Sequence, residues 1–463
     1  MVALLAIAAL ASPAWAVDAD VGGHLGTHLR FALRDCGEGA GDCPLLDYGD
    51  TAVVGGWARA SLNARSHARL AVDLRLHHAV DAELMEETTD PMAVLGASWR
   101  IQEAVIDLRE LGLQALDLEL GVQRVPWGVA DGLHVVDRVN PWDLENPLAL
   151  DARLPVPMAR ALLHKGGVQL EGVWTPMAWP AVLPRQGVEL LPGADEMVGD
   201  GSDFGETFDG VSVNEIEARI EPPERTLDNM GGGARLSWAA ARGDLAVSYF
   251  HGRDSLPQAD GEMIITGFQT SDSRVDVAVP MRYPVVDVAG VEARGELIAD
   301  IGGWVEAAVV FPERTAARAS ATQLEALERL GTIDAVPDPI PKVVTQDGQP
   351  YPTWVVGLDR GFGRVYLNLQ WLHGFPTERQ RSELEDYASV AARITLSDTV
   401  LLSLRALGDV RGAGVLATAD LELLHADAAA IVVGGAWVQA VEGSSLYSFR
   451  GASQIHSGVT LEF

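Results

Sequence analysis

The chain has 463 residues and a formal net charge of −31, from 34 basic and 65 acidic side chains. This balance argues against a nucleic-acid partner, because phosphates are bound by clustered Lys and Arg. The length suits several soluble domains or one large barrel. After residue 16 no apolar run reaches the roughly 18 residues that a transmembrane helix needs, so a helical membrane protein is excluded.

Residues 1–16 form an apolar run that ends in Ala14, Trp15 and Ala16, the pattern of a secretory signal peptide with its cleavage site. We therefore expect a mature chain of residues 17–463 that is exported. A short buried helix is the alternative interpretation of the same run. Export leaves the periplasm, the medium and the outer membrane as destinations.

The two cysteines, Cys36 and Cys43, flank a short Gly-rich segment. In an oxidising compartment this spacing favours a disulfide that closes a small loop. A metal site is the alternative, but the segment itself offers only acidic residues as further ligands.

Polar and apolar residues alternate with a period of two through most of the chain, in runs of about ten residues. Runs of this length and pattern are typical of tilted membrane-spanning strands. A soluble sandwich with one wet face would show the same alternation. We predict an all-β chain of about eighteen strands, with sixteen as the alternative count, near residues 20–33, 50–63, 67–80, 98–109, 113–123, 157–164, 167–175, 233–241, 244–252, 273–291, 297–311, 353–360, 363–374, 385–396, 399–408, 414–425, 428–440 and 446–463.

The connections alternate in length, which favours a membrane barrel over a sandwich. Short turns alternate with long segments, as in an outer-membrane barrel with periplasmic turns and extracellular loops. An even strand count returns both chain ends to the periplasmic side. The long segments lie near residues 34–49, 81–97, 124–156, 176–232, 253–272 and 312–352.

The chain ends on an alternating strand, in which Val459, Leu461 and Phe463 share one face. Phe463 is expected in the aromatic girdle at the periplasmic interface. A closing strand with a terminal aromatic resembles the signal that the barrel-insertion machinery recognises, which implies that machinery as a partner.

The polar faces of the strands carry charges of both signs, as a water-filled lumen would. On the early strands the residues expected to face the lumen are Arg69, Asp73, Arg75, Asp117 and Glu119.

Residues 124–156 are too polar and too rich in proline to be strand throughout, and loops this long are usually functional. We predict that this segment folds into the barrel and narrows it. Packing outside the barrel or over its mouth is the alternative. The constriction residues expected from this segment are Arg124, Trp127, Asp131, His134, Asp137, Arg138, Asn140 and Asp143.

Residues 176–232 form a long acidic segment that we expect outside the cell. Asp203, Glu206 and Asp209 lie among glycines and are weak candidates for a calcium site, without the EF-hand spacing. A solvated acidic loop is the interpretation that we favour.

One stretch is predicted to be helical. Ser320 and Gln323 have capping-box spacing, and Gly331 suits a helix end. We expect a short exposed helix within a long extracellular loop.

The segment from residue 123 to residue 158 resembles one found in a broad group of porin-like or alginate-export-like Gram-negative outer-membrane barrels. The shared pattern is Gln-x-Val-x-Trp-Gly, then Asn-Pro-x-Asp, then Leu-Pro-x-Pro-Met. The resemblance implies a barrel with an inward loop and does not indicate a substrate. The matching residues are Gln123, Val125, Trp127, Gly128, Asn140, Pro141, Asp143, Leu154, Pro155, Pro157 and Met158.

The sequence therefore predicts a porin-like channel for small solutes in the outer membrane, in contact with lipid and lipopolysaccharide. A conduit for lipid or polysaccharide export and a structural or adhesive barrel are the alternatives. An enzyme is not expected, because neither G-x-S-x-G nor H-E-x-x-H occurs. No cofactor is expected, apart from calcium at the acidic loops. Porin-like barrels often trimerise, so a homotrimer is one option.

Overall fold

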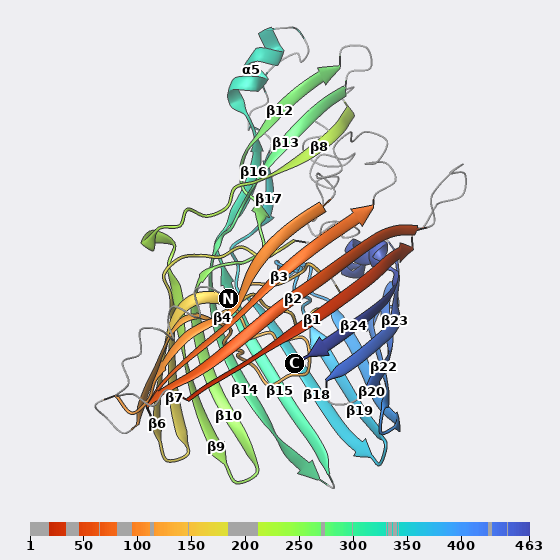
Figure 1. Ribbon diagram of the computed structural model, residues 1–463. Coiled ribbons are helices and arrows are strands. Elements are labelled where there is room, and N and C mark those ends of the chain that lie inside the picture. Colours follow the sequence, from red (N-terminus) through yellow and green to blue (C-terminus); the bar gives the residue numbers. More distant parts are fainter. Residues whose placement is uncertain are drawn as a thin grey trace.

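The computed structural model is an antiparallel barrel of eighteen strands, with a smaller sheet attached to one end (Figure 1). It describes residues 18–33, 46–63, 65–80, 95–111, 115–146, 148–183, 212–269, 274–298, 300–329, 331, 336, 340, 342–424, 428–441 and 443–463. The barrel strands are β1 (Asp18–Leu33), β2 (Leu46–Asn63), β3 (Ser66–Val80), β4 (Leu95–Leu108), β5 (Leu116–Gln123), β6 (Val156–Lys165), β7 (Val168–Thr175), β9 (Gly231–Ala240), β10 (Gly243–Arg253), β14 (Val285–Ile298), β15 (Ile301–Pro312), β18 (Tyr351–Phe362), β19 (Val365–His373), β20 (Asp386–Ser397), β21 (Val400–Asp409), β22 (Gly414–Leu424), β23 (Ala429–Ala440) and β24 (Gln454–Glu462).

The barrel closes because β1 pairs with β2 on one side and with β24 on the other. The last residue, Phe463, extends this seam: its backbone N–H donates to the Gly23 carbonyl at 2.9 Å, and Gly23 donates back at 2.7 Å. The Phe463 ring lies where a side chain at Gly23 would be, and it is 80% exposed. Closure leaves no unpaired edge among the barrel strands.

Side chains alternate between the two faces of each strand, which separates an apolar outside from a more polar inside. On β9, Leu236 and Trp238 point outward and are exposed, whereas Arg235 points inward and pairs with Glu292 of β14. Val459 and Leu461 of β24 are likewise exposed on the outer face. The predicted eighteen-stranded barrel is thus confirmed.

The inner face is not polar along its whole height. At the end of the barrel that carries the long connections, inward residues of β10 to β23 are apolar and buried in one cluster. Examples are Val288, Val355, Leu407 and Leu416. A polar lumen therefore occupies only part of the barrel.

Three segments predicted as loops carry five strands of a second, six-stranded sheet, and the sixth, β13 (Arg274–Arg282), lies in the range predicted as the strand 273–291. This sheet projects from the long-loop end of the barrel, with α5 at its tip (Figure 1). Its own core contains Met263, Val279 and Leu324. Its strands are β8 (Ser212–Ile220), β11 (Gln258–Ala259), β12 (Gly261–Gln269), β13 (Arg274–Arg282), β16 (Thr315–Ala319) and β17 (Lys342–Gln346).

The single strand predicted at 273–291 is wrong, because β13 ends at Arg282 and β14 begins at Val285. Alternation continues on both sides of Tyr283 and Pro284, so the pattern shows no break. Pro284 has no N–H to donate to a neighbouring strand, so β13 ends before it and β14 begins after it. The first of these strands belongs to the small sheet and the second to the barrel.

The predicted helix is present as α5 (Ala321–Arg329). Its first backbone bond runs from Leu324 to Ser320, and Leu324 is buried against the small sheet. The capping box is wrong: the Gln323 amide bonds both backbone groups of Ile265 in β12, at 2.7 and 3.0 Å. Gly331 has φ of +70°, as expected after a helix end.

The closing strand is shorter than the predicted 446–463, because the 3-10 helix η3 (Ser445–Ala452) takes up its first part. A second 3-10 helix among the described residues, η2 (Leu227–Asn229), precedes β9. The Ser444 hydroxyl accepts from the Leu446 N–H at 3.3 Å and starts η3. Leu446 and Phe449 are buried on the same side of η3, since side chains three residues apart align in such a helix.

Several predictions fall outside the described residues. These are the signal peptide of residues 1–16, the Cys36–Cys43 disulfide, and the Asp203, Glu206 and Asp209 group. Among the described residues, the helices are all too short or too polar to span a membrane.

Gly121 of β5 allows a test of the barrel register. Its φ is +138°, and an added Cβ would lie 1.9 Å from the Ala104 carbonyl oxygen of β4. We expect Gly121→Ala to lower the free energy of unfolding by more than about 1 kcal/mol, because alanine cannot adopt this backbone without strain. Urea unfolding in detergent measures this. Gly172→Ala in β7, where the added Cβ meets nothing within 4 Å, is the matched control; equal stability of the two variants would contradict the register.

Candidate functional site

The segment from Arg124 to Pro155 (the inner loop) connects β5 to β6 and crosses the interior of the barrel. Asn140 holds its two ends together. The Asn140 side-chain oxygen accepts from the Val125 N–H at 2.7 Å, and its amide donates to the Leu154 carbonyl at 2.9 Å. Asn140 is buried and all of these bonds are local, so its role is architectural.

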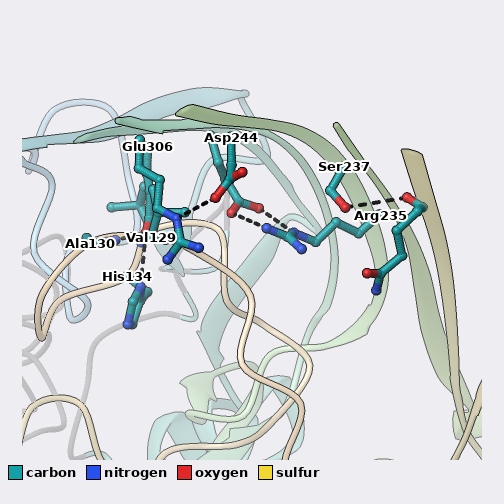
Figure 2. Close-up of polar contacts among 11 residues, drawn as sticks. Val129, Ala130, His134, Arg235, Ser237, Asp244 and Glu306 are labelled. Atoms are coloured by element: carbon teal, nitrogen blue, oxygen red, sulfur yellow. Dashed lines mark hydrogen bonds and ion pairs between the residues drawn. The ribbon is translucent and has the colours of Figure 1, made fainter. Parts of the chain in front are cut away.

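The inner loop reaches the opposite wall at Glu306 of β15. Figure 2 shows the Glu306 carboxylate directed at the loop. It accepts from the N–H groups of Val129, Ala130 (2.6 Å) and Val135 (3.1 Å), and it contacts His134 Nδ1 at 3.0 Å. Glu306 is 0% exposed. Four donors on one buried carboxylate satisfy its charge, so this contact fixes the loop across the lumen.

Other residues of the inner loop contact the barrel wall on both sides of Glu306. Asp131 accepts from the Asn368 amide of β19 at 2.8 Å. On the returning part, Asp143 pairs with Arg100 of β4, and Glu145 pairs with Arg75 of β3 at 2.7 Å. The inner loop is thus bound to β3, β4, β15 and β19, strands that lie around much of the barrel.

Trp127 was predicted to line the constriction, but it is 0% exposed and lies in the apolar cluster. Its ring lies against Gly233 of β9, where an added Cβ would approach within 2.8 Å. Val136 packs against Gly290 of β14 in the same way. Small residues in the wall therefore make room for the loop.

Other predicted loop residues are also engaged inside the fold. Arg153 stacks on Trp142 and lies 3.7 Å from Asp137. Burial lowers the pKa of Arg153 to about 10, and the charge of Asp137 partly offsets this. Arg124 donates to Gln102 at 2.6 Å. Arg138 lines a small cavity beside the inner loop.

The inward charges of the early strands form a paired belt. Arg69 lies 3.0 Å from Glu103, and Arg160 bridges Glu119 at 3.0 Å and Glu171 at 2.7 Å. The other predicted wall residues are also paired: Asp73 with His24 at 3.2 Å, and Asp117 with His164 at 3.6 Å. These contacts bring the predicted wall residues together on β3 to β7.

The open part of the lumen lies on the other side of the inner loop. A space of about 700 Å³ lies between the loop and the inner faces of β19 to β24. Of the predicted constriction residues only Asp131 lines it. The residues that the prediction missed include Arg393, Arg405, Thr418, Gln454 and His456. Each lies on the polar face of a predicted strand. This alternation was the sequence signal that could have identified them as facing the lumen.

No protein-family model and no curated protein matches this chain. Among solved structures, OpdK from Pseudomonas aeruginosa is similar over 96% of this chain and 99% of its own, with 9% identity and a TM-score of 0.46. OmpF from Salmonella typhi, solved with daunomycin, is similar over 96% and 97%, with 8% identity and a TM-score of 0.40. OmpT of Vibrio cholerae is similar over 98% and 99%, with 10% identity and a TM-score of 0.38.

A substitution of Glu306 tests whether this carboxylate holds the inner loop in place. Glu306→Gln keeps the size and one acceptor oxygen but replaces the other oxygen with an NH2 group, so at least one buried N–H loses its acceptor. We expect the free energy of unfolding to fall by about 1–3 kcal/mol, measured by urea unfolding. Glu296→Gln, at an exposed position of the neighbouring β14, should change it by less than about 0.5 kcal/mol. If Glu306→Gln left the free energy of unfolding unchanged, this carboxylate would not hold the loop.

His134 makes the loop contact dependent on pH. Burial by itself lowers the pKa of His134, but the hydrogen bond and charge of Glu306 outweigh it and raise the pKa above its ordinary value of 6.5. The stabilisation is therefore complete below about pH 6.5 and is lost as pH rises through the raised pKa. We expect the stability difference between the parent and His134→Gln to shrink from about pH 5.5 to about pH 9. A constant difference in urea unfolding across that range would contradict a charged pair.

Proposed function

We propose that this protein is a porin-like channel of the outer membrane that passes small solutes. The observation that carries the proposal is the space of about 700 Å³ between the inner loop and β19 to β24, inside a closed barrel. A closed wall separates this space from the surroundings, and polar side chains keep it hydrated.

The outer face supports a membrane location. Outward residues of the strands are large, apolar and exposed, among them Leu236, Trp238, Val356, Leu369 and Val433. Such a surface is unfavourable in water and favourable against acyl chains. Short turns at one end and long connections at the other support an orientation with the short turns in the periplasm. The small sheet would then project from the cell.

The inner loop supports selection by size. Its bonds to β1, β3, β4, β15 and β19 hold it in one position, so the opening beside it has a defined cross-section. A loop held only at its two ends would not limit the size of a passing solute in this way. Asp131 is the loop residue that faces the opening with a charge.

A second candidate is a structural or adhesive barrel, and one observation favours it. At the long-loop end, the inner loop, η3 and the residues after β19 bring apolar side chains into the interior. Phe375 packs on Tyr387 and Phe449, with ring centroids 5.3 and 5.7 Å apart. A barrel filled at this level would conduct poorly.

Adjacent alanines of β20 test the channel directly. In the ladder Ala391 is opposite Arg405 and shares its inner face, whereas Ala392 is opposite Leu404, which is exposed on the outer face. We expect Ala391→Trp to lower the single-channel conductance in a planar bilayer by at least about twofold, since an indole removes cross-section from the opening. Ala392→Trp adds the same side chain on the apolar face, where Trp437 already lies, and should conduct like the parent.

The outcomes separate the two candidates. A conducting parent that is narrowed by Ala391→Trp alone supports the channel. Absence of current from folded parent protein contradicts the channel and favours the filled, structural barrel. Equal effects of the two variants would mean that current does not pass through this space.

A further inference from the structure

We propose that Arg393 and Arg405 form a binding site for the oxyanion group of small anionic solutes, a carboxylate or a phosphate, in the lumenal space. This inference rests on the proposed function and names the solute class of the same channel. It is carried by the placement of two arginines and by their lack of partners.

The two arginines lie side by side on the inner wall. In the ladder between β20 and β21, Arg393 is opposite Ser403, and Arg405 is opposite Ala391. The arginines are therefore diagonal neighbours on the same face, with Cα atoms about 7–8 Å apart. Both line the 700 Å³ space, so both guanidinium groups can reach a solute there.

Their lack of partners distinguishes them from three inward arginines of the other wall. These have carboxylate partners: Arg69 with Glu103, Arg160 with Glu171, and Arg235 with Glu292. Within the described residues, Arg393 and Arg405 make neither an ion pair nor a hydrogen bond. Two adjacent like charges that are not paired with a carboxylate repel each other, and an anion between them reduces that repulsion.

The surrounding carboxylates are already engaged by other groups. Asp420, which lines the same space, accepts from His456 Nε2 at 2.7 Å. Asp359 accepts from the Tyr366 hydroxyl at 2.5 Å. Asp131, on the inner loop, accepts from Asn368. The guanidinium N–H groups therefore remain available to a solute.

Neutral donors complete the site. Ser403 is opposite Arg393, and Thr418 of β22 is opposite Arg405, so both hydroxyls share the inner face with the arginines. A guanidinium presents parallel N–H groups that match the two oxygens of a carboxylate or phosphate. Two such groups with flanking hydroxyls favour an oxyanion over a cation or a neutral sugar.

The first measurement is ion selectivity. Reversal potentials across a KCl gradient are compared for the parent, Arg393→Gln/Arg405→Gln, and the control Arg329→Gln. Arg329 lies on α5 with its side chain 77% exposed, so the control loses charge away from the lumen. We expect the double variant to lower the anion-to-cation permeability ratio at least about threefold and the control to leave it unchanged. An unchanged ratio in the double variant, with current present, overturns the anion site.

The second measurement does not depend on conduction. Inorganic phosphate and acetate are each titrated calorimetrically into the folded barrel in detergent. We expect the parent to bind at least one of the two and the double variant to bind at least about tenfold more weakly. Binding by phosphate alone or by acetate alone identifies the source of the oxyanion. Binding without current would leave the site in place and contradict the channel, whereas no binding of either anion overturns the site.

Discussion

The backbone hydrogen bond between neighbouring strands is the interaction on which this structure depends. Every barrel strand has a partner on both sides because β1 pairs with β24. An open edge would leave a row of N–H and C=O groups without partners, which is unfavourable against lipid. Closure also creates the interior in which the inner loop lies. The exposed Phe463 ring and the two bonds between Phe463 and Gly23 lengthen the seam where this closure is made.

Inside the barrel, one side of the lumen is organised by charge satisfaction and the other is left open. Glu306 is buried because the inner loop covers it, and donors of the loop bond its carboxylate oxygens. On β3 to β7 the acidic and basic side chains pair with each other. On β20 and β21 the arginines have no such partners and face the open space. The asymmetry of the lumen therefore follows from where the loop binds.

Much of the architecture was predictable because alternation reports directly on which side of a strand each residue lies. Sixteen of the eighteen strand ranges were close. The error at 273–291 came from two abutting strands in the same alternating phase, and the error at 446–463 came from the 3-10 helix η3. The small sheet was missed because strands such as β12 and β16 pair in parallel across some fifty residues of sequence. Long-range pairing of this kind leaves no local pattern. For the site, Asp131 was identified and the arginines were not, because nothing in a single strand shows which inward charge lacks a partner.

By itself, the sequence determined the strand phase, the even strand count, the short turns and the presence of a long polar segment between β5 and β6. These features are local, and each depends on the period of two or on turn residues. Only the tertiary structure decided where that segment binds, since the Asn368 partner of Asp131 lies 237 residues away. Only the tertiary structure left Arg393 and Arg405 facing free space. Pairing and burial depend on residues brought together by closure, and no stretch of a single strand contains that information.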